Sequence, residues 1–82
     1  MNVTKADLIA VLQEEAYRRT SPLANGTPNQ ELAMEIGKSV QNAMNQLQRM
    51  GYLPLGLGMP RDIMVDYDRM RTAPQFVVTV RW

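Results

Sequence analysis

The chain of 82 residues contains neither cysteine nor histidine. Without cysteine it can form no disulfide and no thiolate metal site, so neither can reinforce its core. A chain of this size hides only about 60–65% of the surface that its unfolded form exposes. Small domains of this kind often bury further surface against a partner, frequently a second copy of themselves.

Charge of one sign is not in excess, because nine lysines and arginines stand against eight aspartates and glutamates. This balance argues against a polybasic tail or an acidic DNA mimic, but it allows a local basic patch. No apolar run is long enough to span a bilayer, and Asp7 interrupts the apolar residues near the start. We expect a cytoplasmic protein without a membrane partner, in the host cytoplasm or the virion if a phage encodes it.

Side chains suited to catalysis are few. Ser21 and Ser39 have no histidine to activate them, and neither lies in a strand-turn-helix elbow. Gly56 and Gly58 lack the further glycines and the following helix of a phosphate-binding loop. We therefore expect no enzyme activity, no catalytic residue and no cofactor.

Three aspartates fall on one face of an expected strand, at Asp62, Asp66 and Asp68. Clustered carboxylates can bind a hard cation, but this spacing matches no known metal-binding loop. Arginines nearby in the sequence can neutralise these charges. The pattern favours a charged, solvated sheet face and no metal site.

A single helix over residues 28–50 is the element around which the chain is organised. Thr27 suits the N-cap and Pro28 the first helical position. Gly51 suits the left-handed end of the helix, and Tyr52 falls where a Schellman motif packs an apolar residue back. Apolar residues recur at three- and four-residue intervals and share one face: Leu32, Ala33, Ile36, Val40, Ala43, Met44, Leu47 and Met50. Methionines at this spacing, Met34 included, are most simply core residues.

A first helix is predicted over residues 4–19. Thr4 can be its N-cap, with Asp7 in the capping-box position. Leu8, Val11, Leu12 and Ala16 line one apolar stripe. Residues 20–26, TSPLANG, contain a proline and an Asn-Gly turn signal and are predicted to connect the two helices.

Residues 62–69 and 75–82 both alternate with period two and predict a β-hairpin. Residues 70–74, MRTAP, suit the connection. The fold class is therefore α+β, in the order helix, helix, strand, strand, with the apolar faces of the hairpin covering the helices. The last strand leaves an edge that invites pairing with another chain.

The segment 52–59 places large apolar residues among prolines and glycines. Such a backbone cannot be helical and is a poor central strand. The apolar residues either cap the core or form a surface that binds a partner. Together with the last strand, this gives the candidate contact residues Tyr52, Leu53, Leu55, Leu57, Met59, Phe76, Val78, Val80 and Trp82, with Tyr52 and Trp82 as aromatic anchors.

The segment 31–53, ELAMEIGKSVQNAMNQLQRMGYL, resembles the helix-turn-helix of winged-helix DNA-binding domains in the types of residue at Leu32, Ala33, Ile36, Gly37, Ser39, Val40, Met44, Leu47 and Gly51. The predicted hairpin stands where the wing would be. The resemblance implies that residues 39–50 form the recognition helix, with DNA contacts from Lys38, Ser39, Gln41, Asn42, Asn45 and Arg49. The segment is shorter than that family's turn plus recognition helix. Its apolar positions stay in phase as one unbroken helix, which is the alternative structure.

The sequence favours a non-enzymatic interaction protein that self-associates or binds another protein. Small compact chains of this kind are common in phages and other mobile elements, as assembly parts or as inhibitors of host proteins. The alternative function is recognition of duplex DNA by the 39–50 helix.

Overall fold

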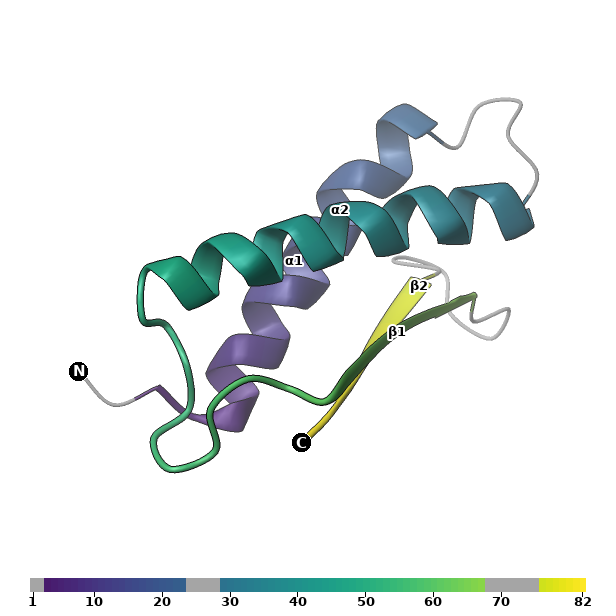
Figure 1. Cartoon of the computed structure of the whole chain (residues 1–82). Coiled ribbons are helices and arrows are strands. Elements are labelled where there is room, and N and C mark those ends of the chain that lie inside the picture. Colours follow the sequence, from purple (N-terminus) through teal and green to yellow (C-terminus); the bar gives the residue numbers. More distant parts are fainter. Residues whose placement is uncertain (1–2, 24–28, 68–75) are drawn as a thin grey trace.

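The computed structural model describes residues 3–23, 29–67 and 76–82. Four elements follow one another in the chain: α1 (Lys5–Leu23), α2 (Asn29–Arg49), β1 (Asp62–Tyr67) and β2 (Phe76–Arg81). The two helices cross, and the antiparallel hairpin lies against the pair (Figure 1). The predicted α+β fold, with two helices followed by a hairpin, is confirmed.

Helix α1 begins with the predicted capping box. The Asp7 backbone N–H donates to the Thr4 hydroxyl at 3.1 Å, and the Thr4 N–H donates to the Asp7 carboxylate at 3.0 Å. The helix continues to Leu23, so its predicted end at residue 19 is wrong. The Thr20 hydroxyl donates to the Ala16 carbonyl at 2.7 Å, which places Thr20 inside the helix. The predicted Asn-Gly turn lies outside the described residues.

Helix α2 runs without interruption through Gly37, the position at which a helix-turn-helix would break. It ends in the predicted Schellman motif. The Tyr52 N–H donates to the Leu47 carbonyl at 2.9 Å, and the Gly51 N–H donates to the Gln48 carbonyl at 3.0 Å. Gly51 has a φ of 76°, a conformation that other residues adopt only with strain. The predicted caps Thr27 and Pro28 lie outside the described residues.

The hairpin pairs apolar residues on its inner face, as predicted. Ile63 is opposite Val80, Val65 opposite Val78, and Tyr67 opposite Phe76. The rings of Tyr67 and Phe76 lie 5.3 Å apart, a tilted aromatic pair. Asp62, Met64 and Asp66 point to the outer, solvent side. The predicted strand ends at residues 68, 69 and 75 and the connection over 70–74 lie outside the described residues.

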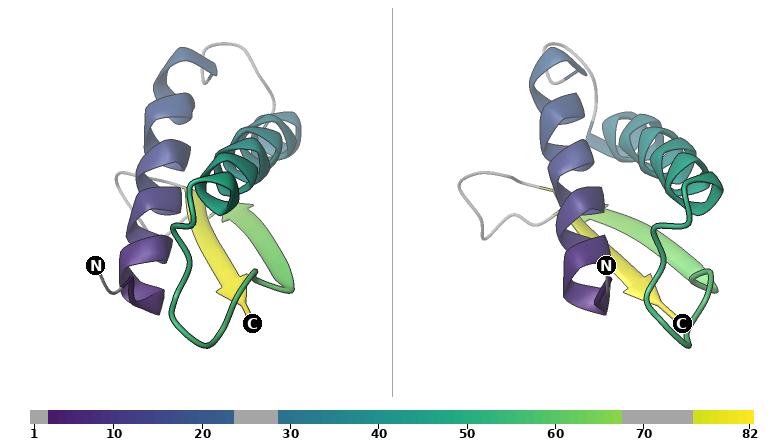
Figure 2. Two further views of the ribbon diagram at one scale, coloured as in Figure 1. Left: turned by 60° about the vertical axis from the view of Figure 1, so that its left-hand side comes forward. Right: turned by 90° about the vertical axis from the view of Figure 1, so that its left-hand side faces the viewer.

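The core forms where the two helices meet the hairpin, with β2 lying between α1 and β1 (Figure 2). It consists of Leu8, Leu12, Ala16, Leu32, Ile36, Val40, Met44, Phe76 and Val78. Three residues predicted for the core, Val11, Met34 and Met50, are exposed instead. Met50 is 77% exposed because α2 ends there, beyond the reach of the hairpin.

Candidate interaction surfaces

The outer edge of β2 is occupied by a side chain from α1. The Gln13 amide nitrogen donates to the Phe76 carbonyl at 2.8 Å, and the Val78 N–H donates to the Gln13 amide oxygen at 2.9 Å. One amide therefore gives one donor and one acceptor, as a residue of a neighbouring strand would. Gln13 takes the place of an additional strand beside this part of β2.

The Gln13 hydrogen bonds also show which backbone groups of the hairpin point outward. Backbone groups of successive strand residues point to opposite edges. Since Phe76 and Val78 bond to α1, residues 77, 79 and 81 direct their groups toward β1. Their partners in the register are Asp66, Met64 and Asp62. The backbone groups of the remaining β1 residues, Ile63, Val65 and Tyr67, therefore point away from β2.

These outward N–H and C=O groups of Ile63, Val65 and Tyr67 form what we call the β1 edge. Among the described residues, no hydrogen bond from another segment reaches them. The three side chains pack against the core but remain half-buried. The β1 edge thus combines unfilled backbone hydrogen-bonding capacity with a row of partly exposed apolar side chains, which is the usual template for pairing with another strand.

Two of the predicted contact residues on β2 have buried side chains. Phe76 is 0% and Val78 5% exposed, so their side chains belong to the core and not to a surface. Gln13 blocks the backbone groups of the same two residues on the outer edge. Val80 and Trp82 are half-buried and pack against the core. The alternation of β2 reflects burial in its own fold.

The apolar segment 52–60 is held in a defined shape. The Leu57 N–H donates to the Pro54 carbonyl at 3.2 Å, and Gly56 has a φ of 81°, as a type II turn requires. Pro54 forms a parallel β-bridge with Val3. The Trp82 indole N–H donates to the Gly58 carbonyl at 3.1 Å, so the end of β2 holds the other side of the segment.

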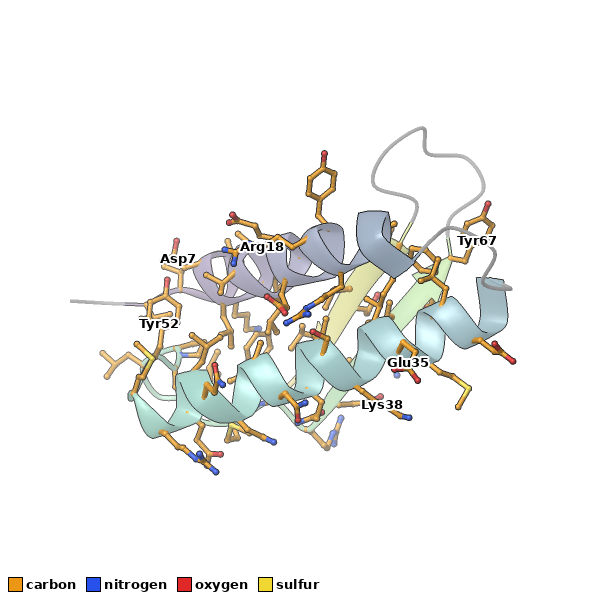
Figure 3. All side chains as sticks on the ribbon, turned by 90° about the horizontal axis from the view of Figure 1, so that it is seen from above. Asp7, Arg18, Glu35, Lys38, Tyr52 and Tyr67 are labelled. Carbon is orange, nitrogen blue, oxygen red and sulfur yellow. The ribbon has the colours of Figure 1, made fainter. Side chains whose placement is uncertain are left out.

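Within this segment the apolar side chains divide into two sets. Tyr52, Leu53 and Met59 pack against the core, as the capping interpretation predicts. Leu55 is 82% exposed and Leu57 is 44% exposed, and both belong to the turn formed by residues 54–57. Tyr52 and Tyr67 lie at opposite ends of the molecule, so this turn is remote from the far end of the β1 edge (Figure 3). Among the candidate contacts of this segment, the two leucines of the turn are the most exposed.

A polar groove of about 310 Å³ runs between α1 and α2, lined by Glu15, Arg19, Ser39, Asn42, Ala43 and Gln46. The Ser39 hydroxyl donates to the Glu15 carboxylate at 2.8 Å, and the Arg19 Nε donates to the same oxygen at 3.1 Å. Partial burial raises the pKa of Glu15, but these hydrogen bonds and the charges of Arg19 and Arg18 together outweigh it, so the pKa lies below its ordinary value. In this groove Arg19 pairs with Glu15 on the same helix, and Ser39 of α2 bonds to the same carboxylate, so these groups connect the two helices.

The residues implied by the winged-helix resemblance all lie on one unbroken helix or at its end. Ser39 is turned toward α1 and bonded to Glu15. Lys38 lies beside Glu35, with its Nζ 3.4 Å from the carboxylate (Figure 3). The other members of the set are exposed: Gln41, Asn42, Asn45 and Arg49. Gln41 donates to Asn45 at 3.4 Å. This face is rich in amides and poor in unpaired positive charge.

Two further kinds of site are not found in the part of the chain that the structure describes. No group of three or more acidic, histidine or cysteine side chains is placed to hold a metal ion there. Neither α1 nor α2 combines the length and the apolar character needed to cross a membrane.

Sequence reasoning missed both Gln13 and the β1 edge. Gln13 is a polar residue on the flank of the apolar stripe of α1, and its partner Phe76 is 63 residues away. No local pattern relates two such positions. The alternation of residues 62–67 indicated a strand, but only the position of α1 shows which strand keeps an accessible edge.

Comparison with protein-family models, with curated proteins and with solved structures finds no match to this chain. The proposals that follow therefore depend on the geometry of these surfaces.

Proposed function

We propose that this chain is a non-enzymatic interaction protein that self-associates through the β1 edge. The observation that supports this most directly is the contrast between the two edges of the sheet. On the β2 edge Gln13 bonds the outward groups of Phe76 and Val78, whereas no described residue bonds the outward groups of Ile63, Val65 and Tyr67 on the β1 edge. The unequal treatment of two edges in one small sheet favours β1 as the side on which a partner binds.

The energetics of so small a sheet support the same proposal. A two-stranded hairpin is marginal by itself, and three or more strands with an apolar face are far more stable. A partner strand on β1 would complete the backbone hydrogen bonds of Ile63, Val65 and Tyr67. It would also cover their half-buried side chains, adding buried apolar area to a chain without disulfides.

The wider role proposed is that of an assembly component in a phage or other mobile element, or of an inhibitor of a host protein. In either role, a strand edge gives affinity through the backbone and selectivity through alternate side chains.

Sedimentation velocity over a wide range of protein concentration tests the proposal. Val65→Pro removes the outward N–H of Val65, the central one of the β1 edge, but it removes no hydrogen bond between β1 and β2. Leu55→Ser is the control, because it removes the most exposed apolar side chain from the turn of residues 54–57 and leaves the β1 edge unchanged.

We expect the mass of the wild type and of Leu55→Ser to rise with concentration, and Val65→Pro to remain monomeric with an unchanged circular dichroism spectrum. A wild type that is monomeric at every concentration would refute self-association. A Leu55→Ser variant that is monomeric, beside a Val65→Pro variant that associates, would assign the contact to the turn instead.

A further inference from the structure

We infer that two copies pair β1 against β1 in antiparallel orientation, around a two-fold axis that passes beside Val65. This inference rests on the proposed self-association and specifies its geometry. The axis is perpendicular to the sheet, so the two hairpins join into one sheet with the strand order β2-β1-β1-β2 and with both helix pairs on the same face. The interface is isologous, because the same edge is used by both copies.

The overlap of the two strands and the residues that meet across them bear on the register. A pairing centred on Met64 would place Asp62 of each copy opposite Asp66 of the other, and one centred on Asp66 would place the two Asp66 side chains together. Like charges directly opposite each other destabilise a strand pair. A pairing centred on Ile63 would overlap only the first residues of the strand. Centring on Val65 places Asp66 opposite Met64 of the second copy and overlaps most of β1, but it sets Asp62 opposite position 68, a further aspartate, so the inner face and not the charge decides the register.

The same register matches the inner faces of the two strands. Val65 meets Val65 of the second copy, and Ile63 meets its Tyr67. These three side chains are the half-buried apolar residues of β1. Aromatic and β-branched residues are favourable cross-strand partners. A pairing centred on Met64 would still match inner face to inner face, as Ile63 with Val65, but it would place Tyr67 opposite Arg61, so only the pairing centred on Val65 gives all three residues an apolar partner.

Helix α2 has a suitable surface beside this axis. It packs over β1, and its flank opposite Ser39, which faces α1, carries Met34, Gly37, Gln41 and Gln48. Met34 is 60% exposed, and the space at Gly37 is open, since an added Cβ would meet nothing within 4 Å. A glycine allows two helices to approach closely, and exposed amides can hydrogen-bond across such a contact.

Single-cysteine variants test the register. The sequence contains no cysteine of its own, so the introduced thiol can form a disulfide only with the same residue of a second copy. Hydrogen-bonded antiparallel partners have Cα atoms about 5.5 Å apart, within the range that a disulfide bridges. Under mild oxidation, Val65→Cys is expected to give a covalent dimer in high yield. Met64→Cys, which faces Asp66 of the second copy and not itself, is the matched control and is expected to give little.

Charge variants at Met64 supply a second, non-covalent measurement. Met64 is on the exposed outer face, so its substitution leaves the core intact. In the proposed register Met64→Lys forms two symmetric ion pairs with Asp66 of the other copy, and Met64→Glu forms two repulsions. We expect the dimer dissociation constant to fall about two- to tenfold for Met64→Lys and to rise by a similar factor for Met64→Glu.

The outcomes separate the two proposals. A covalent Val65→Cys dimer, with opposite shifts for the two charge variants, supports the register. A wild type that dimerises, with efficient cross-linking at Met64→Cys and weaker association of Met64→Lys, overturns the register and leaves self-association standing. A wild type that never associates, with no cross-linking at either position, overturns both.

Discussion

Gln13 and Val78 are 65 residues apart in the chain, and the Val78 backbone N–H donates a 2.9 Å hydrogen bond to the Gln13 side chain. The other end of the same amide binds the Phe76 carbonyl. This pair of bonds fixes α1 beside β2 and occupies the outer edge of the sheet at Phe76 and Val78. We expect it to stabilise the fold, and it is the observation on which the proposed pairing through β1 rests.

Replacement of Gln13 by alanine removes both bonds and leaves two partly buried backbone groups without their partner. We expect the free energy of unfolding in urea to fall by about 1–3 kcal/mol, the cost of unsatisfied groups of this kind. Gln46→Ala, which removes an exposed amide from α2 outside the proposed contact, is the control and should change stability by less than about 0.5 kcal/mol. Equal stabilities for the two variants would show that the Gln13 bonds do not support the fold.

The lowered pKa of Glu15 makes its contribution to stability depend on pH. A carboxyl whose pKa is lower in the folded state stabilises the fold above its unfolded pKa, about 4.3 for glutamate, and loses this contribution as the pH falls through the folded value. We expect Glu15→Gln to be less stable than the wild type at neutral pH, with the difference vanishing in strong acid. Thermal unfolding of both proteins between neutral and acidic pH measures this. Glu14→Gln is the control, since its ion pair with Arg18 is exposed, and a loss as large as that of Glu15→Gln would contradict the assignment.

Two glycines should respond to alanine in opposite directions. Gly37 lies within α2 with open space at the Cβ position, so Gly37→Ala should raise the free energy of unfolding of the monomer by about 0.5–1 kcal/mol. Gly51 has a positive φ at the Schellman motif, so Gly51→Ala should lower it by about 1–2 kcal/mol. Urea unfolding at low protein concentration measures both. A destabilising Gly37→Ala would show that α2 is not a regular helix at that position.

The exposed face of α2 should not bind duplex DNA. Lys38 lies beside Glu35, and phosphate contacts supply most of the affinity of a DNA-binding protein. We expect no retention of the wild type on immobilised duplex DNA at low ionic strength. Retention with a steep salt dependence that is lost in the Lys38→Ala and Arg49→Ala variants would instead favour the winged-helix alternative.

The parts of this fold that the sequence predicts are those with local causes. Thr4 and Asp7 satisfy each other within one turn, and Gly51 with Tyr52 closes α2 through bonds to the turn before it. The alternation of β1 and β2 likewise follows from which side of each strand is buried. Both caps join residues within a few positions of each other, and the alternation of a strand can be read within the strand itself, so each of these elements leaves a local pattern.

The predictions that differ from the structure depend on contacts with residues far away in the chain. The end of α1 was set too early because Pro22 is usually a helix-breaking signal, although the helix extends to Leu23. Met50 has the correct helical phase for the core, but α2 ends at Arg49 and Met50 is 77% exposed. The alternation of Phe76 and Val78 marks burial and not a contact surface, and only the position of Gln13 shows this. Sequence periodicity thus predicts which faces are apolar but not what covers them.

Hydrogen exchange of single backbone amides, followed by NMR at low and high protein concentration, tests the account most directly. The Val65 amide should exchange rapidly in dilute solution and become strongly protected as the concentration rises, because a second chain then accepts its hydrogen bond. The Val78 amide, already bonded to Gln13, should be protected to the same degree throughout. Exchange at Val65 that is independent of concentration would contradict self-association through the β1 edge.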